Sequence, residues 1–307
     1  MADATSSPNE ALAVIGRPVL EAADLAAPRK RLGIATWFAI VWMSVVIVVA
    51  IIGPWLPLDL SSNNPSALAP GQGGHLLGTD KVGHDLLSQI LQGTQATMLV
   101  GIGSVIIGVL IGGFLGLVAG YFKGRFTGAL GSLFDILLAY PPLVLALTLV
   151  SVFANEQDTT TLRRDLVVLI GIGIVSIPIL ARITRANTLV WSEREFVTAA
   201  RAMGANKWRI LFRDVLPNVI PAMLAIALLG VAVAIVAESG LAILGVGVKA
   251  DSTHTSWGQL INIGRNSLSD APFLVFIPAF VLFLTVMSLN YIGDIVRARF
   301  DVKVSAL

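Results

Sequence analysis

Long stretches without any charged residue constrain this sequence more than any other feature. Five runs lack Asp, Glu, Lys and Arg from end to end, at 32–58, 86–122, 136–155, 215–237 and 271–293. A helix needs about 20 apolar residues to cross the hydrocarbon core of a membrane, and each run reaches that length. A sixth run, at 166–181, falls slightly short. Interior β-strands are only about 5–6 residues long, so the runs predict membrane-spanning helices.

The composition excludes an ordinary soluble domain. Hydrophobic residues make up 55% of the chain and charged residues 13%, with a mean hydropathy of +0.83, whereas roughly a quarter of the residues of a soluble domain are charged. The chain contains no cysteine, which excludes disulfides, thiolate metal sites and cysteine nucleophiles. The net charge is only +2, so no nucleic-acid partner is expected.

The pattern predicts an all-α membrane protein with six transmembrane helices. We place the helices at about 34–53, 95–120, 130–153, 166–184, 219–240 and 272–294. The organisation along the chain is then a polar tail at 1–33, the first helix at 34–53, a long loop at 54–94, a core of five helices at 95–300 and a tail at 301–307. Residues 1–28 are expected to be disordered, and the amphipathic stretch Asp85–Gln95 to form a short helix at the membrane surface.

The distribution of basic residues predicts the orientation. Sixteen of the 21 Lys and Arg residues fall in the two tails, the 121–129 connection and the region 182–213, and five fall in the other connections. The positive-inside rule places both termini and the 185–218 connection in the cytoplasm. A cleaved signal peptide ending near Ala67-Leu68-Ala69 is the alternative, but the apolar run is too long and this site lies well beyond its end.

Two kinds of residue indicate how the helices pack. Small residues recur every fourth position on one face of the second helix and predict its close approach to a neighbour; they are Gly108, Gly112, Gly116 and Gly120. Pro141-Pro142 in the third helix and Pro178 in the fourth predict local breaks in the backbone ladder. Such breaks fit either a water-facing wall or a simple packing kink.

The connection between the fourth and fifth helices predicts two short helices. Ser192 and Glu195 form a capping box at the start of the first, and Gly204 suits the left-handed position that ends it. Asn206 can cap the second helix, and Pro217 is expected to stop it before the fifth span.

Aromatic residues on this connection indicate a docking surface. Phe196, Trp208 and Phe212 lie on a segment predicted to stand outside the bilayer. Exposed aromatic side chains of this kind favour contact with another protein or with the membrane surface.

The same segment resembles the EAA loop of ABC importer permeases. The matching residues are Glu195, Ala199-Ala200, Gly204 and Leu216-Pro217. Other stretches are similar to dipeptide and oligopeptide permeases of the C-subunit type; they are Gly78–Ser88, Glu238–Gly247, Ser256–Gly258 and Asn290–Asp294. The resemblance covers about 34–300. His84 departs from it, since an Arg is usual there, and the ending at 299–303 follows the family only loosely.

This resemblance implies a type I ABC importer permease in the bacterial inner membrane. It implies pairing with a homologous second permease to form the path for di- or oligopeptides, two ABC ATPase subunits, and an extracytoplasmic substrate-binding protein or lipoprotein. The segment 192–217 would be the element that couples to the ATPases. Its expected coupling residues are Glu195, Phe196, Ala199, Ala200, Gly204, Trp208, Arg209, Phe212, Arg213, Leu216 and Pro217.

The outer connections at 54–94 and 241–271 would meet the binding protein. The candidate gate or binding-protein contacts are Asp80, Asp85, Glu238 and Trp257. Glu238 lies near the outer end of the fifth helix, where an ionisable residue is a functional candidate or simply reaches water. His84 is either a pH-sensitive contact or a tolerated exposed residue.

Enzymatic motifs are absent from the sequence, which argues against a catalytic chain. GxxxxGK[ST], HExxH and GxSxG do not occur, and the three histidines are far apart in sequence. No cofactor is expected on this chain, and ATP and Mg²⁺ would bind the partner ATPases. Two alternatives stay open: the same scaffold importing nickel, haem or another small solute, and an ion-driven secondary transporter, which would need more ionisable residues inside its helices.

Overall fold

The computed structural model describes residues 33–58, 62, 64–122, 124–153, 161–250 and 254–305. The expected disordered tail therefore lies outside the described residues. The chain divides into two compact units, Met1–Trp37 and Phe38–Leu307, and the larger unit contains the helical bundle.

Helices make up nearly all of the described residues, and no strand occurs among them. Five helices are each long and apolar enough to cross a membrane, and a sixth crossing results if the two arms of one bent pair count together. The predicted all-α membrane fold is therefore confirmed.

The first crossing is α2, Ile34–Ile52, followed by the short turn η1, Gly53–Trp55. These bounds agree with the predicted helix. The indole Nε1 of Trp42 donates a hydrogen bond of 3.0 Å to Thr285 Oγ1 of α12. This bond joins the first crossing to the last one by a polar contact inside an otherwise apolar interface.

The second crossing is longer than predicted, because it begins at residue 86 instead of 95. It consists of α3 (Leu86–Ile107), the π-turn η2 (Gly108–Gly113) and α4 (Phe114–Tyr121) in one continuous helix. Asp85 caps its start by accepting a 2.8 Å hydrogen bond from the Ser88 amide. The expected surface helix at Asp85–Gln95 is wrong, since these residues form the first turns of α3, and the outer loop ends at residue 85 instead of 94.

The third crossing is broken. Helix α5, Arg125–Ala139, and helix α6, Pro142–Phe153, meet at an angle of 88°. Tyr140 between them is extended, as expected for a residue that precedes a proline. Two adjacent prolines lack amide donors and cannot continue the helical ladder. The break predicted at Pro141-Pro142 is therefore confirmed, and it divides the helix predicted at 130–153 into two arms.

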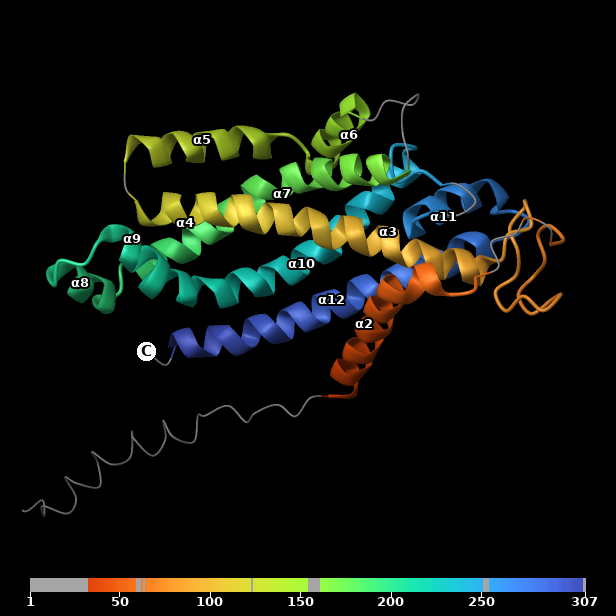
Figure 1. Cartoon of the computed structure of the whole chain (residues 1–307), viewed down its shortest axis with the longest axis horizontal. Coiled ribbons are helices and arrows are strands. Elements are labelled where there is room, and N and C mark those ends of the chain that lie inside the picture. The colour runs from red at the N-terminus through yellow and green to blue at the C-terminus, as the bar shows by residue number, and fades with distance from the viewer. Residues whose placement is uncertain are drawn as a thin grey trace, which may run out of the picture. The chain divides into compact units, whose positions relative to one another are not determined.

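The remaining crossings extend past the charge-free runs. They are α7 (Thr161–Ser192), α10 (Leu216–Ile243) and α12 (Phe273–Ser305). Helical turns that extend beyond the hydrocarbon core can contain charged residues. The charge-free runs therefore underestimate the lengths of these three helices. The boundary predicted between the core and the tail at 300–301 falls inside α12 and is not a structural boundary. Pro178 lies within α7 without ending it. Figure 1 shows α3 with α4, α7, α10 and α12 running lengthwise through the bundle, whereas α2 lies obliquely to them.

The glycine-rich face of the second crossing packs against α7. A side chain at Gly112 or Gly116 would overlap a backbone carbonyl of α7, at Ile177 and Ala181 respectively. At Gly108 and Gly120 the added carbon would lie 2.7 Å from Leu180 and 2.6 Å from Thr188. The two helices thus approach each other as closely as small residues allow.

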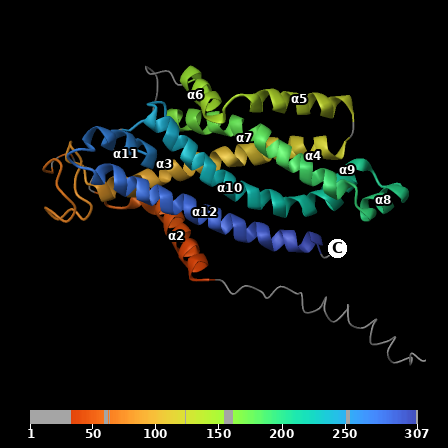
Figure 2. The same ribbon diagram turned by 180° about the vertical axis from the view of Figure 1, so that it is seen from behind.

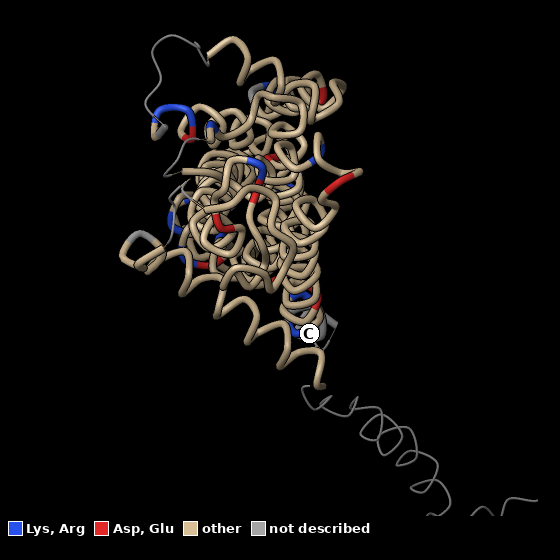
Figure 3. The backbone as a smooth tube through the Cα atoms, turned by 90° about the vertical axis from the view of Figure 1, so that its right-hand side faces the viewer, with Lys and Arg blue, Asp and Glu red and all other residues tan. Residues whose placement is uncertain are grey.

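The two ends of the bundle differ in which segments they carry. We call the end with residues 122 and 124 and the connection 193–206 the elbow end. The end with residues 64–85, 244–250 and 254–256 and helix α11 (Trp257–Gly264) is the loop end. Figures 1 and 2 both place the C-terminal part of α12 toward the elbow end. In Figure 3, which views the bundle from the loop end, most of the tube carries no charge.

Candidate functional site

The segment predicted to form two short helices, residues 192–217, is called the elbow. Its first helix, α8, spans Glu195–Ala202. The predicted capping box is wrong, because Ser192 is the last residue of α7 and its hydroxyl donates to the Leu189 carbonyl at 2.9 Å. Arg194 occupies the cap position and makes no side-chain capping bond.

The turn of the elbow has the geometry that Gly204 predicts. Gly204 has a φ of +77°, in the left-handed region that side chains disfavour. Its amide donates to the Arg201 carbonyl at 3.0 Å, and the Ala205 amide donates to the Ala200 carbonyl at 3.1 Å. This pair of bonds is a Schellman motif, which satisfies the last carbonyls of α8.

The second elbow helix does not stop at Pro217. It begins at α9, Lys207–Arg209, where the Asn206 side chain accepts from the Trp208 amide at 2.9 Å. It then continues through the π-turn η3, Ile210–Val215, directly into α10. Pro217 lies where η3 passes into α10, and the helix runs through it without a break. The predicted break is wrong, and the elbow joins the fifth crossing as one helix.

A separate apolar cluster fastens the elbow to the bundle. We call this cluster the elbow core; its fully buried members are Leu117, Tyr121, Val197, Ile210, Leu211, Val215 and Val219. They come from α4, α8, η3 and α10, so the elbow packs on the end of the second crossing. Burial of these side chains makes the elbow one unit with α4 and α10.

Three aromatic side chains of the elbow face outward. Phe196, Trp208 and Phe212 are 41%, 48% and 44% exposed. Trp208 stacks on Phe212 with ring centroids 5.9 Å apart and meets Phe122 at 4.9 Å. The stacked rings therefore form a rigid apolar surface open to solvent.

The other predicted coupling residues lie on the same segment and differ in exposure. Glu195, Ala199, Gly204, Arg209, Arg213 and Pro217 are exposed, whereas Ala200 and Leu216 are half-buried against the elbow core. The structure brings these residues together on one segment, on both sides of the Gly204 turn.

Sequence reasoning missed the contacts that join the elbow to the end of α4. The Arg201 guanidinium lies 5.3 Å from the centre of the Tyr121 ring, and Phe122 contacts Trp208. Tyr121 and Phe122 end a charge-free run, and nothing in their spacing indicates a partner about 80 residues away.

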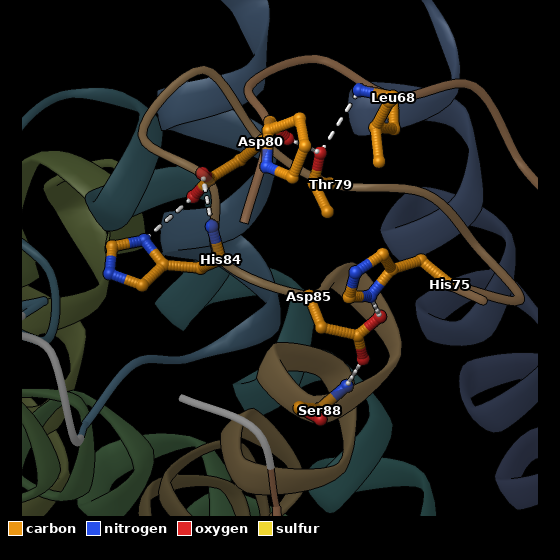
Figure 4. A network of polar contacts seen from close by, with 8 residues as sticks. Leu68, His75, Thr79, Asp80, His84, Asp85 and Ser88 are labelled. Atoms are coloured by element: carbon orange, nitrogen blue, oxygen red, sulfur yellow. Dashed lines mark hydrogen bonds and ion pairs between the residues drawn. The ribbon is translucent and has the colours of Figure 1, made fainter. Parts of the chain in front are cut away.

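Polar contacts organise the loop end (Figure 4). Asp80 accepts hydrogen bonds from the amides of Val82 and His84 and from Gln89, and its carboxylate lies 3.1 Å from His84 Nδ1. Burial alone would raise the pKa of Asp80, but the hydrogen bonds from His84, Gln89 and Val82 outweigh it and hold that pKa below its usual 3.8. Asp85 lies 2.9 Å from His75 Nδ1.

The predicted gate residues Glu238 and Trp257 are internal. Their exposed fractions are 0% and 1%. Glu238 accepts a 2.6 Å hydrogen bond from Ser256, and Trp257 donates from its amide to Thr97 at 3.1 Å and from its ring to the Ile90 carbonyl at 3.0 Å. Neither side chain reaches water or is free to touch another protein, so both instead anchor α11 to α3 and α10.

All three histidines of the chain pair with carboxylates at the loop end. Besides His75 and His84, His254 Nε2 lies 2.8 Å from the buried carboxylate of Asp165 at the start of α7. Because the three histidines are far apart in sequence, their common pairing with carboxylates could not be predicted. His84 is therefore not a tolerated exposed residue. Among the described residues, no cluster of three His, Asp or Glu side chains could hold a metal ion.

The fold has known counterparts. A methionine ABC transporter, MetNI, in an inward-facing conformation matches with a TM-score of 0.55 at 17% identity, covering 69% of this chain and 95% of that chain. An amino acid ABC transporter with histidines matches with a TM-score of 0.52 at 16% identity, covering 70% and 93%. These similarities concern the fold.

Sequence comparison is more specific. DppC, a di/tripeptide transport system permease protein of Pseudomonas aeruginosa, is 34% identical over 86% of each chain. DppC, a dipeptide transport system permease protein of Alkalihalophilus pseudofirmus, is 34% identical over 87% of this chain and 86% of its own. GsiD, a glutathione transport system permease protein of Pectobacterium atrosepticum, is 34% identical over 76% and 74%.

The family model described as "Binding-protein-dependent transport system inner membrane component" matches residues 108–306, which include the elbow and four of the membrane crossings. The chain thus belongs to this family of inner membrane components, and it is a multi-pass permease subunit of an ABC importer.

Proposed function

We propose that this permease forms, with a homologous second permease, the path through which an ABC importer takes up di- and oligopeptides. Two separate ATPase subunits drive the movement through the elbow, and an extracytoplasmic binding protein delivers the cargo at the loop end. The excess of basic residues toward the elbow end supports a cytoplasmic elbow.

The observation that carries the coupling assignment is the exposed aromatic surface on a firmly held elbow. Phe196, Trp208 and Phe212 are each roughly half exposed, although the helices beneath them are fully packed. Large aromatic side chains with neighbouring arginines are the usual energetic centres of protein interfaces. Arg209 and Arg213 lie at the edge of this surface, where they can make rim contacts.

The elbow core supplies a mechanical connection to the crossings. Because Val197 and Ile210 pack against Leu117 and Tyr121, a force on the elbow acts on α4 as well as on α10. Closure of two ATPases would push two such elbows together and shift the bundle between inward- and outward-facing states. A change between inward- and outward-facing states of this kind needs rigid helices that move about an interface with two stable arrangements.

The chain itself contributes no nucleotide chemistry in this proposal. It lacks the phosphate-binding GxxxxGK[ST] sequence, so ATP and Mg²⁺ bind the partner ATPases and this subunit is non-catalytic. The peptide cargo is supported by the relatives, whose names refer to dipeptides, di/tripeptides and glutathione.

Two substitutions in the elbow test the coupling. Glu195→Lys reverses an exposed charge on α8, and Gly204→Leu places a side chain at a φ of +77°. We expect each to lower peptide uptake and binding-protein-stimulated ATP hydrolysis about tenfold or more in the reconstituted importer, a loss typical of interface centres. Asp135→Asn removes an exposed charge of α5 without placing a second cation beside Arg182, and it should leave both activities nearly unchanged.

Unchanged uptake and ATP hydrolysis in Glu195→Lys and Gly204→Leu would refute the coupling role. The cargo is tested separately, by mass spectrometry of the ligand that copurifies with the associated binding protein. A peptide is expected. Nickel, haem or another solute would overturn the peptide assignment and leave the coupling role intact.

A further inference from the structure

A polar pocket at the loop end has no role in the contacts described so far. Its volume is about 290 Å³, and it lies between the first turn of α7 and the connection from α10 to α11. Arg164, Lys249 and Gln259 supply its polar side chains, and Gly245, Gly247 and Ala250 bring backbone to its wall.

Among the residues that the structure describes, the two cationic groups of the pocket have no acidic partner. Arg164 Nε donates to the Gly247 carbonyl at 3.2 Å, which fixes the guanidinium at the wall. Throughout the described part of the chain, neither Arg164 nor Lys249 has a carboxylate partner. Two unpaired cations beside an amide favour a small anion, and a guanidinium favours a carboxylate.

Buried contacts hold the walls of the pocket in place. Next to Arg164, the carboxylate of Asp165 pairs with His254 at 2.8 Å. On the opposite wall, Ser256 donates to Glu238 at 2.6 Å and accepts from the Gln259 amide at 3.2 Å. Asp165 and Glu238 are thus engaged with their own partners, and the cationic groups sit on a preorganised frame.

We propose that this pocket binds the C-terminal carboxylate of the peptide cargo as it enters the permease. The inference rests on the proposed peptide function. A concave volume at the lower end of the range for small-molecule sites suits the last residue of a peptide. A docking protein would instead need a surface of about 800 Å².

Thiol labelling in the assembled importer tests this site. The chain has no cysteine, so Ala250→Cys places its one thiol at the pocket wall. The rates of modification by a sulfonate-bearing and a trimethylammonium-bearing methanethiosulfonate are read from the mass of this subunit. We expect the anionic reagent to react about five- to tenfold faster than the cationic one, because the cations attract it.

Protection identifies the ligand. Millimolar dialanine should slow modification of Ala250→Cys about threefold or more, whereas dialaninamide, which lacks the carboxylate, should not. Adding Lys249→Gln should lower both the reagent preference and the protection. Lys81→Gln removes a charge elsewhere at the loop end, from an exposed pair 3.9 Å from Asp270, and should change neither.

Three results would overturn the inference: no preference for the anionic reagent, equal protection by dialanine and its amide, or protection by the cargo-free binding protein alone. The last result would make the pocket a docking contact. Because labelling needs no ATP hydrolysis, a failure here is distinct from a failure of the coupling role. Lys249→Gln leaves the Arg164 bond to Gly247 intact, so loss of folding does not confound it.

Discussion

An apolar cluster holds the elbow end together, whereas the loop end combines apolar packing with side-chain hydrogen bonds and ion pairs. The elbow core contains no ion pair, and its outer surface carries three half-exposed aromatic rings. At the loop end, the His75–Asp85 and His254–Asp165 pairs and the Glu238–Ser256 bond fasten loops and α11 to the crossings, and the His84–Asp80 pair lies within the loop. The elbow end thus exposes aromatic rings, and the loop end uses its polar side chains in internal contacts.

This difference suits different tasks. Apolar contacts are non-directional, so the elbow can transmit a push without breaking specific bonds. Buried hydrogen bonds demand one geometry and are costly to leave unsatisfied, so the polar ties define the shape of the loop end. The loop end is therefore built for fixed positioning, and the elbow end for contact and movement.

The largest expected effect contrasts two tryptophans. Trp257→Ala should lower the free energy of unfolding in detergent by about 3–5 kcal/mol, because it removes a buried ring and the hydrogen bond from the indole to the Ile90 carbonyl. Trp208→Ala, at a half-exposed position, should cost only about 1–2 kcal/mol yet impair uptake. Denaturant titrations and uptake assays measure both. Equal destabilisation by the two substitutions would break the comparison.

A pair of glycine substitutions tests the close packing of α4, which supports the elbow, against α7. Gly116→Ala places a carbon against the Ala181 carbonyl of α7 and should cost about 1–3 kcal/mol by overpacking. Gly128→Ala in α5 meets no atom within 4 Å and should be neutral or stabilising by up to about 1 kcal/mol. Thermal unfolding in detergent measures the two. If Gly116→Ala were neutral, the close packing of α4 on α7 would not hold.

A double-mutant cycle sharpens the description of the elbow. Phe122→Ala and Trp208→Ala remove two rings whose centroids lie 4.9 Å apart. We expect a coupling energy of about 0.5–1.5 kcal/mol in unfolding. Phe122→Ala combined with Phe196→Ala serves as the control, since Phe196 instead contacts Trp191. Additive effects of Phe122→Ala and Trp208→Ala would show that the elbow and the end of α4 are independent.

The smallest expected effect is the change in stability at low pH that Asp80 of the loop end causes. Because the pKa of Asp80 is lowered in the folded state, its ionised form stabilises the fold above the unfolded value. This contribution is lost as the pH falls below about 4 and through the folded pKa. Asp80→Asn should therefore be less stable than the parent protein at neutral pH, with the difference narrowing in acid. A constant difference across pH titrations of thermal stability would contradict the assignment.

Several features of the fold could be predicted from local sequence. Charge-free runs identify the crossings because a membrane excludes charges and unsatisfied backbone groups over a fixed thickness. Gly204 and Asn206 identified the elbow turn and cap because both effects act within one turn of helix. The ends of helices were less predictable. Asp85 caps α3, Ser192 ends α7 and Pro217 continues a helix, and each of these roles depends on whether the preceding residues are helical.

By itself, the sequence determined the membrane class, the elbow and the family, because each depends on composition or on residues close together along the chain. Only the tertiary structure decided that Glu238 and Trp257 are internal anchors, that each histidine has its own carboxylate, and that Tyr121 and Phe122 support the elbow. Those contacts join residues from different helices, and the packing of the helices determines which side chains meet.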